Sequence, residues 1–134
     1  MTEPSGGSDL QAIRTRAVRD GDDWILNGSK TFISNGNHAT LALVAARTDI
    51  DARPAHGMSL FLVDTRLHAG FKKGKNLRKI GQPTYDTAEL FFDNVRLPMN
   101  AVVGKLVLFH IEPIDSQESI IQVVHRVSTR ASII

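Results

Sequence analysis

Turn signals recur along this chain at a spacing of about ten residues, and each one separates two short apolar runs. Asp20-Gly21, Asn27-Gly28 and Asp93-Asn94 are the clearest of these signals. Runs of this length fit β-strands and leave no room for helical crossovers between parallel strands. The sequence therefore predicts a mainly β fold, an antiparallel β-barrel or sandwich, and not a parallel α/β sheet. The expected strands cover residues 13–18, 24–26, 29–33, 40–46, 59–63 and 87–92.

Several segments carry more specific predictions. Ile13, Thr15 and Ala17 alternate with arginines, which is the period of two of a half-exposed strand. Asn27-Gly28 is a strong hairpin signal, because both residues tolerate a positive φ, and it predicts a turn between two strands. Trp24 is expected to pack at the start of the first of these strands.

Composition narrows the class of protein. At 134 residues, with 42% apolar and 22% charged residues, the chain fits one soluble globular domain. Its net charge of +2 is too small to predict a nucleic-acid partner. No window reaches the ~18 uninterrupted apolar residues of a membrane span, and we expect no targeting segment in this chain. Cysteine is absent, which excludes disulfides and thiolate catalysis, and the histidines are scattered, so we expect no metal site.

A basic stretch lies between Asp64 and Asp86, where no acidic residue occurs. A solvated surface loop is the first interpretation, since charge runs are usually solvated. The alternative is a patch that attracts the phosphates of a coenzyme or another polyanion. The stretch contains Arg66, Lys72, Lys73, Lys75, Arg78 and Lys79.

The character of the sequence changes after Gly104. Residues 105–111 form one more apolar run, and Pro113 interrupts it. Asp115 then begins a capping-box pattern, and apolar residues follow at helical spacing. We therefore expect a β-domain over residues 1–104 and a divergent tail over 105–134, a strand followed by a short amphipathic helix from about 116 to 130.

Two polar loops are candidates for a binding site. In the first, Pro4 fixes one φ angle, and Gly6 and Gly7 allow successive N–H groups to turn toward one anion such as a phosphate. Ser8 adds a hydroxyl group there. The second loop places Phe32, Ile33 and Ser34 in a row, which suits one face and one edge of a flat ring.

Each of these features also has a purely structural interpretation. Gly6 and Gly7 are compatible with a tight turn that binds nothing. Phe32 lies between Thr31 and Ile33 in an expected strand, so on spacing alone it is a core residue. Asp86 is expected at a turn before a strand, and Glu89 faces solvent on the alternation, which makes it a poor general base.

Three ordered blocks resemble the middle β-domain of the flavin-dependent acyl-CoA dehydrogenases, most closely the long-chain members. The blocks are M-T-E-P-S-G-G-S-D-L at 1–10, D-D-W-I-L-N-G-S-K-T-F-I-S-N-G at 22–36 and D-T-A-E-L-F-F-D-N-V-R-L-P at 86–98. The resemblance extends from Met1 to about Gly104, and the tail does not share it. Three blocks in order are far more specific than one glycine-rich loop.

The resemblance implies an antiparallel β-barrel that binds FAD and an acyl-CoA substrate. Matched position by position, Met1 and Thr2 lie at the flavin pyrimidine edge, and Ser34 reaches the N5 side of the ring. Phe32 packs against the flavin beside Ile33. Gly7 and Ser8 lie at the FAD pyrophosphate, and Ser8 also neighbours the acyl-CoA.

The resemblance also implies a reaction and partners. Family members remove an α proton from a fatty acyl-CoA with a glutamate while the β hydrogen leaves as hydride to flavin N5. They form homo-oligomers and pass electrons to an electron-transfer flavoprotein, in the bacterial cytoplasm or the mitochondrial matrix. This chain has no match for the glutamate, so we expect a fragment that is inactive alone and binds FAD weakly or not at all. The alternative is a non-catalytic domain that binds acyl-CoA or nucleotides, or that contacts another subunit.

Overall fold

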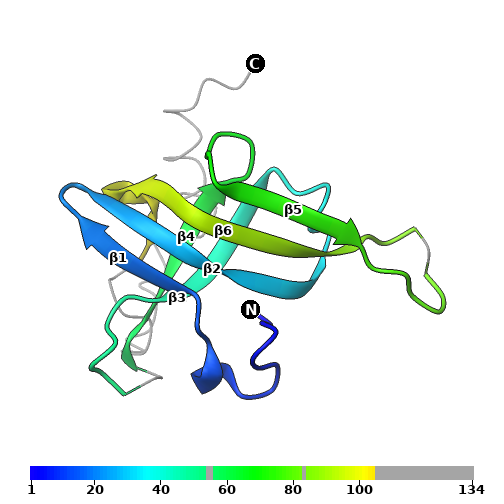
Figure 1. Ribbon diagram of the computed structural model, residues 1–134, viewed down its shortest axis with the longest axis horizontal. Helices are drawn as coiled ribbons and strands as arrows, with labels where there is room; N and C mark the ends of the chain where they lie inside the picture. The colour runs from blue at the N-terminus through cyan, green and yellow to red at the C-terminus, as the bar shows by residue number, and fades with distance from the viewer. Residues whose placement is uncertain (54–55, 83, 105–134) are drawn as a thin grey trace, which may run out of the picture.

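The computed structural model describes residues 1–53, 56–82 and 84–104, and these form one seven-stranded sheet (Figure 1). The strand order is β5-β6-β2-β1-β3-β4-β7. Every ladder is antiparallel except the step from β1 to β3, where Arg16 pairs with Arg47 in parallel. The mainly β prediction is confirmed. The elements are η1 (Leu10–Ala12), β1 (Arg16–Asp20), β2 (Asp23–Ser34), β3 (Leu41–Arg47), β4 (Met58–Asp64), β5 (Phe71–Asn76), β6 (Thr87–Pro98), η3 (Met99–Ala101) and β7 (Val102–Val103).

The sheet curls around one core. Three strand spacings separate β2 from β4, which would be about 14 Å in a flat sheet. The rings of Trp24 on β2 and Phe61 on β4 nevertheless meet edge to face with centroids 5.5 Å apart. This curvature is that of a barrel, although no ladder joins β5 to β7 within the described strands. The core around this contact comprises Ala17, Trp24, Leu26, Val44, Ala46, Phe61, Val63, Leu90, Phe92, Val95, Leu97 and Ala101.

The predicted hairpin at Asn27-Gly28 is wrong. β2 runs without interruption for 12 residues, and the first hairpin turn lies instead between Asp20 and Asp23. Asn27-Gly28 lies opposite a bulge in β6, because two steps along β2, from Leu26 to Gly28, oppose three along β6, from Val95 to Phe92. The side chain of Asn27 accepts a hydrogen bond from the Asn94 backbone N–H at 2.9 Å, so an asparagine stabilises the irregularity.

Two further predictions need correction on the other side of the sheet. The basic stretch is not only a loop, because its middle part forms β5, which pairs with β6. The turn expected at Asp93-Asn94 is absent, since β6 continues through both residues to Pro98. Asn94 has a φ of +49° there, a left-handed conformation that bends the strand without ending it.

The alternation predicted for the first strand is confirmed, because Ile13, Thr15 and Ala17 are buried and their neighbours are exposed. Trp24 is buried as expected. In the described part of the chain, no helix has the length and apolarity needed to cross a bilayer. The strand and helix predicted after Gly104 lie outside the described residues.

Candidate functional site

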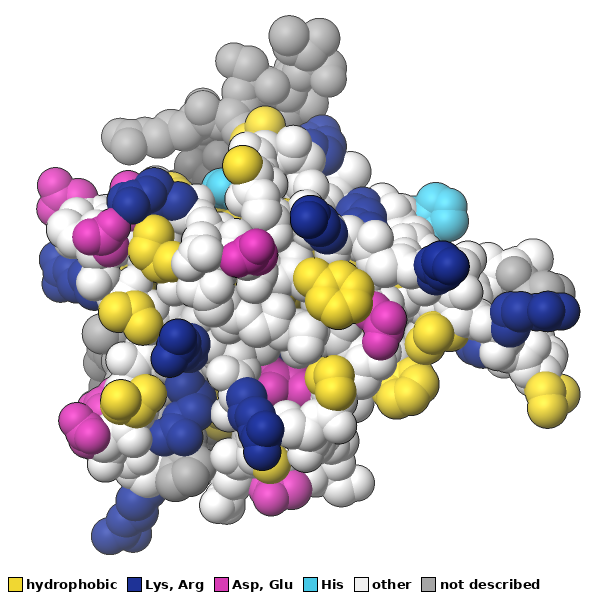
Figure 2. Space-filling model, viewed as in Figure 1, with side chains coloured by type: hydrophobic (Ala, Val, Ile, Leu, Met, Phe, Trp, Pro, Cys, Tyr) yellow, Lys and Arg dark blue, Asp and Glu magenta, His cyan; other side chains and the backbone are white. Residues whose placement is uncertain are grey.

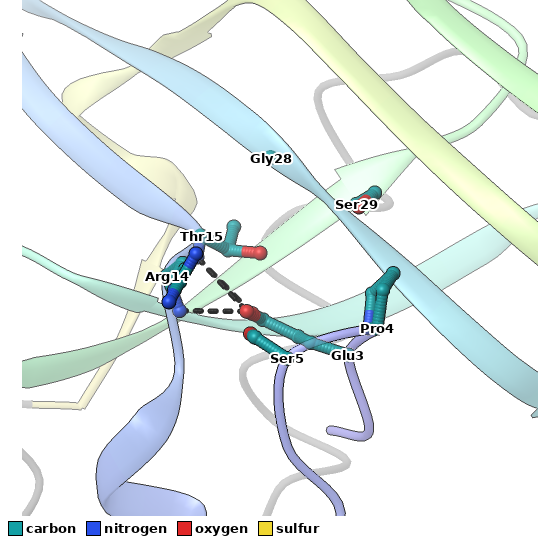
Figure 3. A pocket seen from close by; sticks show the side chains of 7 residues that line it. All are labelled: Glu3, Pro4, Ser5, Arg14, Thr15, Gly28 and Ser29. Carbon is teal, nitrogen blue, oxygen red and sulfur yellow. Dashed lines mark hydrogen bonds between the residues drawn. The ribbon is translucent and has the colours of Figure 1, made fainter.

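The N-terminal segment is fixed to the sheet by a buried carboxylate. The side chain of Glu3 is only 2% exposed. Its oxygens accept hydrogen bonds from the backbone N–H groups of Arg14 at 2.6 Å and Thr15 at 3.1 Å, which Figure 3 shows as dashed lines from Glu3 to the segment just before β1. A third donor, the Lys30 ammonium on β2, lies 2.7 Å away. Glu3 therefore connects the first loop to two strands.

Lys30 completes this connection. Its ammonium group donates a second hydrogen bond to the backbone oxygen of Ala45 on β3 at 2.8 Å. Burial lowers the pKa of Lys30, and the adjacent Glu3 carboxylate opposes that shift. Burial alone would raise the pKa of Glu3, but the hydrogen bonds from Lys30, Thr15 and Arg14 outweigh it and lower this pKa below its usual value. Glu3 is therefore ionised at neutral pH, and the pair is a buried salt bridge.

A pocket of about 260 Å³ opens beside this salt bridge, and we call it the Met1 pocket. It brings together Met1, Ile33 and Ser34, three of the residues that the sequence assigned to flavin binding. Lys30 forms part of its wall. The remaining lining is mostly apolar and comes largely from β3: Asn35, Gly36, Ala39, Leu41, Ala42, Leu43, Val44, Ala45, Thr65 and Leu90.

The other candidate residues are not part of the Met1 pocket lining. The backbone oxygen of Thr2 accepts a hydrogen bond from the Thr31 N–H at 2.9 Å, which holds the first residues along β2. A Cβ added to Gly7 would meet only Thr2 Cγ2, at 3.8 Å, so Gly7 lies next to Thr2 and faces open space. Ser8 is exposed, and no contact of its side chain with the pocket is present.

Phe32 is not a core residue, which corrects the interpretation from spacing. Its side chain is 65% exposed, and its φ is +56°. A positive φ is unusual for an aromatic residue, and here it coincides with a register shift between Lys30 and Ile33. The shift turns the ring out of the sheet, next to two residues of the pocket wall.

The first glycine loop contains a tight turn. Glu3 and Gly6 exchange two backbone hydrogen bonds, Glu3 N–H to Gly6 at 3.0 Å and Gly6 N–H to Glu3 at 3.1 Å. A Cβ at Gly6 would lie 3.0 Å from the Cβ of Ala12, so a larger residue would be crowded at this position and the fold itself favours glycine there. At Gly7 an added Cβ would meet only Thr2 Cγ2, at 3.8 Å, so the fold does not require a glycine there.

The loop after Ser34 is held by a second buried carboxylate. Asp86 accepts a hydrogen bond from the backbone N–H of Asn37 and lies 3.5 Å from the His38 ring. Burial would raise the pKa of Asp86, but these contacts outweigh it and lower the pKa. Lys73 holds the same loop through the backbone oxygens of Asn37 and Ala39, both at 2.9 Å.

The sequence analysis missed Glu3 and Lys30 and gave Asp86 only the role of a turn residue. A usable signal did exist for Lys30. Trp24, Leu26 and Lys30 fall on the same period of two, so a continuous strand would have placed this lysine inside. An inward lysine needs a buried anion.

A second pocket, of about 240 Å³, lies on the other side of the salt bridge, and we call it the Glu3 pocket (Figure 3). A Cβ at Gly28 would come within 2.7 Å of the Thr15 Cα at the edge of this pocket, so β2 and the segment just before β1 approach here as closely as glycine allows. The lining residues are Glu3, Pro4, Ser5, Arg14, Thr15, Gly28 and Ser29.

The basic stretch remains open to solvent on one face. Figure 2 shows Lys and Arg side chains spread over the part of the surface where β5 lies. Lys72, Lys75, Arg78 and Lys79 are exposed, and no ion pair is formed by them within the described residues. Both earlier interpretations, a solvated segment and a phosphate-attracting patch, are compatible with this surface.

Comparison with known proteins extends these observations. Residues 1–95 match the family described as acyl-CoA dehydrogenase, middle domain. The long-chain specific mitochondrial acyl-CoA dehydrogenase of Mus musculus is 58% identical over 106 residues, which are 78% of this chain and 24% of the mouse protein. This chain thus spans about a quarter of the length of that relative.

Solved structures give the same result. The acyl-CoA dehydrogenase of Geobacillus kaustophilus superposes with a TM-score of 0.76 at 50% identity, over 79% of this chain and 28% of that one. A glutaryl-CoA dehydrogenase from Mycobacterium smegmatis, solved in complex with FADH2, has a TM-score of 0.67 at 48% identity, over 75% of this chain and 24% of that one. The curled sheet, the two loops beside the Met1 pocket and these similarities agree: this chain belongs to the acyl-CoA dehydrogenase family and corresponds to its middle domain.

Proposed function

We propose that this chain is the flavin-binding β-domain of an FAD-dependent acyl-CoA dehydrogenase that acts on fatty acyl-CoA. One observation carries the proposal: Met1, Ile33 and Ser34 come from two segments of the chain and line one pocket. Thr2 lies alongside them through its hydrogen bond to Thr31.

The residues present fit one part of FAD. The Met1 pocket is smaller than the ~300–1,000 Å³ typical of sites that enclose a drug-sized ligand, so it suits a single ring system and not a whole dinucleotide. Its apolar β3 wall matches a flat ring, and the Ser34 hydroxyl matches a polar edge atom. The remainder of the cofactor would lie over Gly7 and Ser8, where the fold itself does not require the glycine.

The proposed roles follow from this arrangement. Ser34 would donate a hydrogen bond to the ring edge, Phe32 would cover part of the ring, and Ser8 would contact the diphosphate and the acyl-CoA. When bound, FAD supplies the acceptor for the hydride that leaves the β-carbon of the substrate. Among the described residues, no carboxylate lines the Met1 pocket, so we propose that the group that accepts the α proton comes from another part of the complete protein.

Partners and location belong to the same proposal. The complete protein would form homo-oligomers and would transfer its electrons to an electron-transfer flavoprotein. The mouse relative is named as mitochondrial, and we propose the mitochondrial matrix for a eukaryotic source and the cytoplasm for a bacterial one.

A chimera tests the proposal. Residues 1–104 replace the matching segment of the Geobacillus kaustophilus enzyme, with which this chain shares 50% identity. We expect the chimera to retain FAD and to oxidise acyl-CoA. Ser34→Ala should weaken FAD binding about 2–10-fold, the equivalent of one hydrogen bond, whereas Ser29→Ala on the same strand should not. A folded chimera that contains no flavin would disprove the proposal.

The isolated chain addresses the expectation of an incomplete site. We expect little or no quenching of FAD fluorescence when the 134-residue chain is added. Saturable micromolar binding with acyl-CoA-dependent bleaching would contradict that expectation. Binding of acyl-CoA without flavin, measured by calorimetry, would instead support the non-catalytic alternative.

A further inference from the structure

The Glu3–Lys30 salt bridge separates the two pockets. Glu3 lines the Glu3 pocket and Lys30 lines the Met1 pocket, and the ammonium and carboxylate meet at 2.7 Å between them. The pair thus presents its positive end to the Met1 pocket. Two of the three Lys30 N–H groups have acceptors among the described residues, Glu3 and Ala45.

We propose that Glu3 and Lys30 are positioning residues, whose salt bridge holds Met1 and Thr2 against β2 and so forms one wall of the Met1 pocket. The relevance of this inference to flavin binding rests on the proposed function, in which Met1 and Thr2 lie at the flavin edge. The position of the N-terminal segment itself is measurable without flavin.

Stability alone does not explain a salt bridge here. Both side chains are almost fully buried, at 2% and 4% exposure, and removing two charges from water opposes folding. Apolar residues of the same size are often as stabilising in such places. Apolar residues form no directional hydrogen bonds. The Glu3–Lys30 pair forms them with the segment just before β1 and with β3, and its own bond joins the first loop to β2.

The first residues have few other connections to the sheet. Thr2 accepts one hydrogen bond from Thr31, and this bond lies next to Glu3 in the chain. If Glu3 loses its charge, its bonds to Lys30, Arg14 and Thr15 weaken together. The neighbouring Thr2–Thr31 bond then becomes the remaining link between this segment and β2, and we expect it to open.

Protonation of Glu3 is therefore a switch for this segment. The charged group that acts on both members of the pair is the terminal ammonium of Met1. Arg14 contributes its backbone N–H and β3 contributes the Ala45 backbone oxygen. Hydrogen bonds hold the pKa of Glu3 below its usual value of 4.5. The contribution of the pair is therefore complete above pH 4.5 and is lost as the pH falls through the lower pKa of the folded protein.

Amide hydrogen exchange on the full 134-residue chain tests the inference. In Glu3→Gln, the Thr31 amide should exchange at least about tenfold faster than in the wild type, while the Leu26 amide in the same strand stays protected. Glu3→Asp should restore part of the protection. The matched control is Asp23→Asn, which removes a β2 carboxylate paired with exposed Arg96, and it should leave Thr31 unchanged.

A pH series on the wild type gives a second measurement that needs no variant. Protection of Thr31, corrected for intrinsic exchange, should fall below pH 4.5 before that of Leu26, and Glu3→Gln should remove this dependence. Unchanged Thr31 protection in Glu3→Gln, or a flat wild-type profile, overturns the inference. If Thr31 responds as expected but the chimera binds no FAD, the positioning role stands and the proposed flavin function fails.

Discussion

Replacing Lys30 by methionine is the most informative test of the packing beneath the Met1 pocket. Lys30 is 4% exposed, and its ammonium is the only side-chain cation bonded to Glu3 among the described residues. Lys30→Met keeps the length of the side chain but leaves a carboxylate that is 2% exposed without a counter-charge. Breaking a buried pair in this way costs about 3–5 kcal/mol. Domains of this size are stable by about 5–15 kcal/mol, so the loss is a large fraction of the total.

The double variant separates charge from shape. Glu3→Gln combined with Lys30→Met removes both charges, and its stability should lie within about 1–2 kcal/mol of the wild type, because no uncompensated ion remains. The two single changes should therefore be strongly non-additive in a double-mutant cycle. Lys72→Met, at an exposed lysine on β5, is the control and should change stability by less than about 0.5 kcal/mol.

Urea unfolding provides the measurement. Trp24 is the only tryptophan, and it is 4% exposed against Phe61, so its fluorescence reports the core directly. The midpoint should fall for Lys30→Met and recover in the double variant at a similar slope. A Lys30→Met protein as stable as the wild type, with a double variant that is less stable than either single change, would refute the reasoning.

Three further predictions concern the fold and its pH dependence. Gly28→Ala should destabilise the protein by about 1–3 kcal/mol in thermal unfolding, because the added Cβ would come within 2.7 Å of the Thr15 Cα. Gly21→Ala is the comparison: Gly21 has a φ of +62° but no atom within 4 Å of an added Cβ, so this change should cost only about 1 kcal/mol. Phe61→Ala should cost about 3–5 kcal/mol in the same assay, because the ring is fully buried. Asp86→Asn should be less stable than the wild type at neutral pH, and the difference should shrink below pH 3.8 as the wild-type carboxylate, whose pKa is lowered, becomes protonated. Equal differences at both pH values would show that the charge of Asp86 is not involved.

The strands that the sequence predicted correctly are those with a regular pattern. Alternation identified the first strand, and continuous apolar residues identified β3 and β4, because these patterns follow directly from the pleat. The Asn27-Gly28 prediction failed for a physical reason: a glycine with a positive φ fits a continuous strand opposite a bulge as well as a hairpin turn. Only pairing with a distant strand distinguishes the two, and Asn94 is 67 residues away.

Separation along the sequence also limits prediction of the site. Met1, Ile33 and Ser34, which the resemblance assigned to the flavin, line one pocket, and their role in binding a flavin stays a prediction. Composition and spacing did not predict the salt bridge between Glu3 and Lys30, whose residues are separated by 27 positions and belong to a loop and a strand. The exposure of Phe32 depends on a register shift, which leaves no mark on local periodicity.

The pairing of β2 with β6 has a consequence for synthesis. Each of these strands has 12 residues, yet β2 begins at Asp23 and β6 ends only at Pro98. During synthesis on the ribosome, the edge of β2 that pairs with β6 therefore keeps its backbone N–H and C=O groups unpaired until residues 87–98 have emerged. A chain that ends before Thr87 would leave that edge of β2 exposed, and an exposed strand edge is a template for aggregation. We therefore expect chaperones to bind the nascent domain until β6 has been synthesised.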